Sequence, residues 1–211
     1  LPPKDAVRIE ELVNYFRYDY PEPRGREPFS ITSEVGACPW TPDHRLVLVG
    51  LRGRSLDDES LPPRNRTFLL DVSGSMNSPD KLPLLKRAMG LLVDTLGEED
   101  RVAIVVYAGA SGLVLDPTSG AKKGTIEAAL ESLRAGGSTA GGAGIELAYR
   151  VAAESYVEGG INRVILATDG DFNVGLSSEG DLVRLIEEKR ESGIFLSVLG
   201  FGRGNLHDSK M

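Results

Sequence analysis

The sequence contains very little cysteine or histidine. Its 211 residues include one Cys, Cys38, and two His, His44 and His207. A single cysteine excludes an internal disulfide framework. One Cys and two His also cannot supply the tetrahedral N and S ligands of a structural zinc site. We therefore expect the fold to depend on a hydrophobic core, which a chain of this length can bury.

Long apolar runs and an excess of positive charge are absent as well. No apolar stretch approaches the roughly 20 residues of a membrane helix, so we predict no membrane span. Lys and Arg number 24 against 31 Asp and Glu, for a net charge of −7. Without a clustered basic face, nucleic acids and anionic membranes are poor partners. Apolar residues at 41% and charged residues at 26% are typical of a globular protein.

The first residues are Leu1-Pro2-Pro3, and no charged start followed by an apolar stretch marks a signal peptide. We interpret the chain as a processed protein or a fragment. Its localisation therefore stays open at this point.

Residues 1–62 are expected to form an N-terminal extension. Residues 29–35 and 45–51 resemble short strands, and residues 5–16 have helical spacing. We expect the extension to pack on the rest of the chain through an apolar stripe on that helix, formed by Ile9, Leu12, Val13 and Phe16.

Residues 57–66 are charged and contain Pro62-Pro63, and after them apolar runs alternate with amphipathic helices to residue 211. The predicted strands are 67–71, 102–107, 113–115, 164–168 and 194–201. The predicted helices are 81–96, 126–133 capped by Thr125, 145–156 and 181–190. Most apolar runs are continuous, which is typical of strands covered on both faces. Residues 63–211 are thus expected to form an α/β domain: a Rossmann-like, mostly parallel sheet with helices on both faces.

Oxygen-bearing side chains follow the predicted strands. One strand leads into Asp71-Val72-Ser73-Gly74-Ser75, and another ends in Thr168-Asp169-Gly170. A glycine-rich segment, 136–142, contains Ser138 and Thr139 and opens a helix. Ligands of open α/β sheets bind beyond the carboxyl ends of the strands, so we expect these groups to converge there.

This set of donors predicts the kind of ion. Carboxylates, hydroxyls and water are hard oxygen ligands, which suit Mg²⁺, Mn²⁺ or Ca²⁺ and not zinc or copper. Asp71 and Asp169 supply two negative charges, which a divalent ion balances. Hydroxyl ligands leave that ion electrophilic, so a partner's carboxylate could bind at an open position. We expect both carboxylates to have a low pKa once they are committed to the ion.

The pattern Asp71-x-Ser73-x-Ser75, then Thr139, then Asp169 resembles the metal-ion-dependent adhesion site of von Willebrand factor type A domains. Further segments are similar to a bacterial subgroup, the YfbK-type proteins, often labelled Ca-activated-chloride-channel-like. These segments are Arg8-Ile9-Glu10-Glu11-Leu12-Val13-Asn14-Tyr15-Phe16, Cys38-Pro39-Trp40 and Gly141-Gly142-Ala143-Gly144.

The resemblance implies a non-enzymatic adhesion module that binds Mg²⁺, with Mn²⁺ or Ca²⁺ as alternatives. It implies a protein partner that donates an acidic side chain, and a place in the cell envelope or periplasm. Counting does not settle whether Ser138 or Thr139 faces the metal; the distance to Ile145 favours Thr139. The family's sheet has a final strand and helices after the region of Gly202, which this chain, ending at Met211, would lack.

Other interpretations of the same residues are weaker. Asp71-x-Ser-x-Ser alone is compatible with a capped turn. A serine hydrolase would need Gly-x-Ser-x-Gly and a histidine base, and an aspartyl phosphatase would need an acid where Ser73 stands. No Gly-x-x-x-x-Gly-Lys-Ser/Thr loop occurs. The alternative that stays open is a metal-dependent phosphate or nucleotide site at the glycine-rich segment.

Overall fold

The computed structural model describes residues 12–55, 61–108, 110–137, 142–170 and 179–202. The chain divides into two compact units, Leu1–Leu61 and Pro62–Met211, which are described here one at a time. Most of the helix expected over residues 5–16 lies outside the described residues. The packing expected for its apolar stripe therefore stays a prediction.

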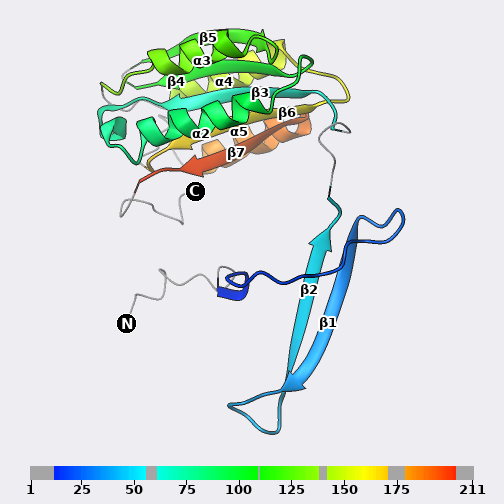
Figure 1. Ribbon diagram of the computed structural model, residues 1–211. Helices are drawn as coiled ribbons and strands as arrows, with labels where there is room; N and C mark the ends of the chain where they lie inside the picture. Colours follow the sequence, from blue (N-terminus) through cyan, green and yellow to red (C-terminus); the bar gives the residue numbers. More distant parts are fainter. Residues whose placement is uncertain (1–11, 56–60, 109, 138–141, 171–178, 203–211) are drawn as a thin grey trace. The chain divides into compact units, whose positions relative to one another are not determined.

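The first unit contains an antiparallel hairpin of β1 (Phe29–Ala37) and β2 (Arg45–Gly53), as Figure 1 shows. Both predicted strands are confirmed. On one face, Arg52 donates to the carbonyl of Tyr20 over 2.7 Å and pairs with Glu22. The other face is apolar and exposed, and it carries Ile31, Val35, Val47, Val49 and Leu51.

The second unit is built on a five-stranded sheet in the order β5-β4-β3-β6-β7. Its strands are β3 (Arg64–Asp71), β4 (Arg101–Tyr107), β5 (Ser111–Ser119), β6 (Ile161–Thr168) and β7 (Ile194–Gly200). Only β5 runs antiparallel to its neighbour, so the predicted mostly parallel sheet is confirmed. The central strand β3 therefore ends between the carboxyl ends of β4 and β6.

Helices cover both faces of this sheet (Figure 1). The helices α2 (Leu82–Asp94) and α3 (Lys123–Ser132) share one core with the sheet, and α4 (Gly142–Glu154) and α5 (Glu179–Glu191) share the other. Within the described residues, none of these helices combines the length and apolar composition that crossing a bilayer requires.

Two of the differences from the sequence-based expectations concern helices. The helix α3 begins at Lys123, so Thr125 lies inside the helix and is not its cap. The cause is a turn after β5, in which Lys122 N–H donates to the Ser119 carbonyl over 2.9 Å and starts the helix early. A short 3₁₀ helix, η3 (Gly74–Asn77), also follows β3 and was not predicted.

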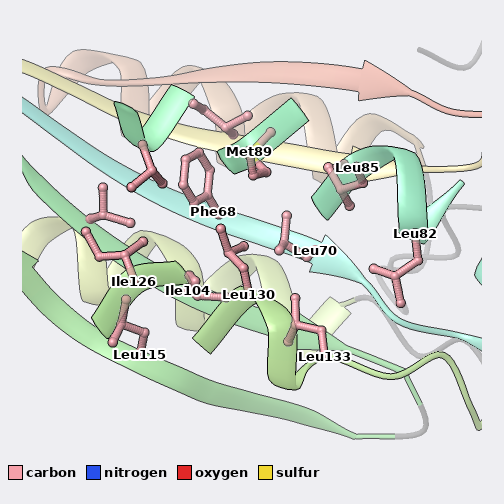
Figure 2. Packing of buried hydrophobic residues seen from close by; sticks show 14 of the residues in the cluster. Phe68, Leu70, Leu82, Leu85, Met89, Ile104, Leu115, Ile126, Leu130 and Leu133 are labelled. Carbon is pink, nitrogen blue, oxygen red and sulfur yellow. The ribbon is translucent and has the colours of Figure 1, made fainter. Parts of the chain in front are cut away.

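The continuous apolar sequence of β3 is explained by its position between the two cores. Phe68 and Leu70 point toward α2 and α3, where they pack with Leu85 and Met89, as Figure 2 shows. Leu69, between them, belongs to the opposite core. All three β3 side chains are fully buried. A strand in this position must be apolar on both faces.

Gly144 lets α4 lie close to the sheet. A Cβ atom there would be 2.9 Å from Tyr107 Cβ and 3.3 Å from Leu69 Cδ1. We expect Gly144→Ala to destabilise the protein by about 1–3 kcal/mol, because these buried neighbours leave no room for a methyl group. Urea unfolding measures this change.

A matched control separates this steric effect from helix propensity. Gly90 lies in α2, and a Cβ atom there would meet nothing within 4 Å. We expect Gly90→Ala to stabilise the protein by about 0.5–1 kcal/mol through helix propensity alone. Equal stabilisation by both substitutions would refute the close approach at Gly144.

Candidate metal centre

Asp71 is the last residue of β3, and its carboxylate is fully buried. One oxygen, Oδ1, accepts a hydrogen bond from Ser73 N–H over 2.8 Å. The other, Oδ2, accepts from Tyr107 Oη over 3.2 Å and from Thr168 Oγ1 over 3.4 Å. These partners are neutral donors from β3's own loop and from the ends of β4 and β6. They orient the carboxylate without balancing its charge.

The surroundings of Asp71 disfavour its charged form. Burial raises the pKa of Asp71, and the nearby charge of Asp169 adds to this effect, although the hydrogen bonds from Ser73 oppose it. Burial and the charge of Asp71 likewise raise the pKa of Tyr107, so its hydroxyl remains a donor. The low pKa that we expected applies to a carboxylate committed to the ion, and the metal-free chain does not test it. A cation beside the carboxylate would lower the pKa again.

The two serine hydroxyls of the motif are within hydrogen-bond distance of each other. Ser73 Oγ and Ser75 Oγ are 2.9 Å apart, and Ser73 is almost fully buried. Ser75 lies in η3, which the fully buried Met76 anchors in the core. The loop therefore presents both hydroxyls next to the turn that Asp71 forms with Ser73.

The glycine-rich segment is attached to this loop. Gly136 N–H donates to the Val72 carbonyl over 2.7 Å, and Gly74 N–H donates to the Gly137 carbonyl over 3.1 Å. Gly137 has a φ of 82°, a conformation that favours glycine. The predicted ligand Thr139 and its alternative Ser138 follow directly in the sequence, but both lie outside the described residues.

Asp169 follows β6 and is fully buried. Its Oδ2 accepts a hydrogen bond from Lys81 Nζ over 2.8 Å, and the same ammonium donates to the Ser75 carbonyl over 3.1 Å. Asp169 is also close enough to Asp71 for its charge to raise the pKa of Asp71. The structure thus brings together four predicted ligands: Asp71, Ser73, Ser75 and Asp169.

Sequence reasoning missed two residues of this site, Lys81 and Tyr107. Lys81 offers a faint signal, because it directly precedes α2, where a cation opposes the helix dipole. Tyr107 reads as one more apolar residue of β4. Only the pairing of β4 with β3 places it opposite Asp71.

The residues present fit a hard divalent cation. The described residues include no cluster of three or more His, Cys, Asp or Glu side chains. The described oxygen donors here are two carboxylates, Asp71 and Asp169, and the hydroxyls of Ser73 and Ser75. The ammonium of Lys81 already occupies a cation position between a carboxylate and a carbonyl oxygen. Oxygen donors of this kind suit Mg²⁺, Mn²⁺ or Ca²⁺.

Comparison with known protein families gives two matching family models. A family model described as von Willebrand factor type A domain matches residues 67–211, and another described as von Willebrand factor matches residues 1–48. The chain is 44% identical to YfbK of Escherichia coli strain K12 over 218 residues, which cover 100% of this chain and 38% of YfbK. The chain thus spans well under half of that relative's length.

Solved structures are also similar to this chain, among them two that are 27% or more identical to it. BatB from Bacteroides thetaiotaomicron is 32% identical with a TM-score of 0.53, covering 64% of this chain and 65% of BatB. Proximal thread matrix protein 1 from the mussel byssus is 27% identical with a TM-score of 0.55, covering 71% of this chain and 38% of that protein. In that structure of the mussel protein, zinc occupies the metal-ion-dependent adhesion site.

Proposed function

The chain belongs to the von Willebrand factor type A domain family, and from this premise we propose that its second unit is a Mg²⁺-dependent protein-binding module. Asp71, Ser73, Ser75 and Asp169 would hold the ion, together with Thr139. The family resemblance favours the cell envelope or periplasm as the place where the module acts.

One observation carries the proposal: Asp71 and Asp169 are both fully buried at the carboxyl ends of adjacent strands. In the described part of the chain, the hydrogen-bond partners of Asp71 are neutral. A buried carboxylate is costly unless a cation compensates it. A divalent ion beside both carboxylates would supply that compensation, and Mn²⁺ or Ca²⁺ could replace Mg²⁺.

The site is suited to binding rather than turnover. When bound, the metal would act as an electrostatic clamp for a carboxylate of the partner. The Ser73 hydroxyl contacts Ser75, and the Tyr107 hydroxyl keeps its proton. A serine nucleophile is activated by an adjacent general base such as histidine. Both histidines, His44 and His207, lie outside the motif segments. The partner that fits is therefore a protein segment exposing Asp or Glu.

Calorimetric titration of EDTA-dialysed protein with Mg²⁺ and Mn²⁺ tests the metal site. We expect one saturable site per chain. An acidic peptide library then tests the partner class: we expect peptides that bind in Mg²⁺, dissociate in EDTA and fail to bind when their Glu is replaced by Gln. Binding that survives EDTA, or that tolerates the Gln replacement, would refute the clamp.

The same protein should show no metal-dependent turnover. We expect no hydrolysis of p-nitrophenyl phosphate, p-nitrophenyl acetate or ATP above the rate measured with Asp71→Ala. Steady turnover that this variant loses would instead establish the alternative, a metal-dependent phosphate or nucleotide site.

A further inference from the structure

Lys81 makes contacts that a surface lysine does not make. Its side chain is only 15% exposed, and its Nζ lies 2.8 Å from Asp169 Oδ2. The same ammonium lies 3.1 Å from the Ser75 carbonyl oxygen. Asp169 and Ser75 are both predicted metal ligands. The ammonium of Lys81 is thus a cation of the chain itself that contacts two of the predicted metal ligands.

The position of Lys81 in the helix makes this placement informative. Lys81 is the N-cap residue of α2, a helix of 13 residues. The N-terminus of a helix carries partial positive charge, which disfavours a cation there. No capping hydrogen bond from the side chain offsets this effect. The ion pair with Asp169 therefore accounts for the inward position of the ammonium.

We propose that Lys81 is a built-in counter-cation that the divalent ion displaces. Without metal, the ammonium partly balances the buried carboxylates and keeps the loop in place. When metal binds, the repulsion between an ammonium and a doubly charged ion in a buried site drives Lys81 outward. Its flexible four-carbon stem lets the ammonium reach water. Lys81 thereby lowers the affinity for metal. This inference rests on the proposed metal site.

A second role for Lys81 predicts the opposite result. Lys81 could stay on Asp169 Oδ2 and orient the carboxylate for a metal at the other oxygen, as outer partners of metal ligands do. Removing the ammonium would then weaken metal binding. In the exchange that we propose, removing it strengthens metal binding, so the sign of the change decides between the two roles.

The test compares the parent protein with Lys81→Met, a substitution that keeps the length of the side chain and removes its charge. We expect Lys81→Met to bind Mg²⁺ and Mn²⁺ about tenfold more tightly in calorimetric titration. We also expect a lower melting temperature in EDTA and an unchanged one in saturating Mg²⁺. Lys86→Met is the matched control, because Lys86 lies on the same helix and pairs with Glu131 at 2.9 Å. It loses the same charge, but its affinity for metal should stay that of the parent.

Chemical labelling follows the displacement directly. Acetylation of Lys81 by an N-hydroxysuccinimide ester, followed by mass spectrometry, should become faster when Mg²⁺ is added, with Lys86 as the internal reference. Weaker or equal metal binding by Lys81→Met, or labelling that Mg²⁺ does not accelerate, would overturn the exchange. If the parent chain binds no metal, the proposed function fails first. The two failures are therefore distinguishable.

Discussion

Asp71→Ala is expected to abolish binding of divalent metal, weakening it at least about 100-fold, or about 2.7 kcal/mol. The substitution leaves one carboxylate, Asp169, opposite a doubly charged ion. It also removes the acceptor for Ser73 N–H, which shapes the turn of the loop. Calorimetric titration with Mn²⁺ and Mg²⁺ gives the two dissociation constants to compare.

The variant itself should remain folded. Burial raises the pKa of Asp71, which means that its charged form is unfavourable in the chain alone. Removing it takes away this unfavourable charge but leaves the donors of Ser73, Tyr107 and Thr168 without their acceptor, so we expect a moderate loss of stability and an unchanged circular dichroism spectrum. Comparing the stability of the variant and the parent, both in EDTA, separates the effect on folding from the effect on metal binding.

Two further variants sharpen the result. Asp71→Asn keeps the size and an oxygen acceptor for Ser73 N–H, but it loses the charge. It should bind metal nearly as poorly as Asp71→Ala. Asp116 is an exposed carboxylate on β5, and Asp116→Ala changes the net charge equally. It should bind metal like the parent. A parental dissociation constant for Asp71→Ala would move the metal site elsewhere.

The sequence allows the prediction of continuous apolar strands, and it falls short at an irregular edge strand. The edge strand β5 shows this: only residues 113–115 were predicted, whereas the strand runs Ser111–Ser119. Asp116-Pro117 resembles a turn. In the structure the pairing with β4 skips these two residues, so that Val102 faces Thr118 and Ile104 faces Leu115. Proline is tolerated at such irregularities of edge strands. Local sequence does not distinguish that case from a turn.

Some residues of the candidate site could likewise be predicted from the sequence, and others could not. Asp71, Ser73 and Ser75 are recognisable because alternate positions directly after a buried strand must present their side chains at one edge of the sheet. Asp169 is recognisable because β6, like β3, is a continuous apolar run. Lys81 could not be assigned to this site, because its contact depends on where α2 begins relative to the end of β6, 88 residues away in the sequence. Such contacts are tertiary and leave no local pattern.

The far end of β3 is fixed by an ion pair between Arg64 and Asp100. Asp100 is buried, with 3% of its surface exposed. Its Oδ1 accepts from Arg64 N–H over 2.8 Å, and its Oδ2 accepts from Arg64 Nη2 over 2.6 Å and from Gly97 N–H over 2.9 Å. Burial raises the pKa of Asp100, but the hydrogen bonds from Arg64 and Gly97 outweigh it and hold the pKa below its usual value.

Asp100→Asn is expected to destabilise the protein by about 3 kcal/mol. The substitution removes the negative charge of a buried ion pair and leaves the positive charge of Arg64 uncompensated. A depressed pKa contributes stability above the pKa of the unfolded state, and that contribution is lost as pH falls through the folded value. The difference from the parent should therefore be constant near neutral pH and shrink below about pH 4. Urea unfolding at a series of pH values measures it.

Glu99→Gln is the control for this prediction, because Glu99 is the exposed neighbour of Asp100. It should leave stability unchanged. Asp100→Asn should also keep the parent's affinity for Mn²⁺, since Asp100 precedes β4 and Asp71 ends β3, at opposite ends of the paired strands. Asp71→Ala should instead lose metal binding in a chain that remains folded in EDTA. A pH-independent stability difference for Asp100→Asn, or one that Glu99→Gln matches, would mean that the ion pair does not fix the start of β3. A loss of metal affinity in Asp100→Asn would mean that folding and metal binding cannot be separated along this strand.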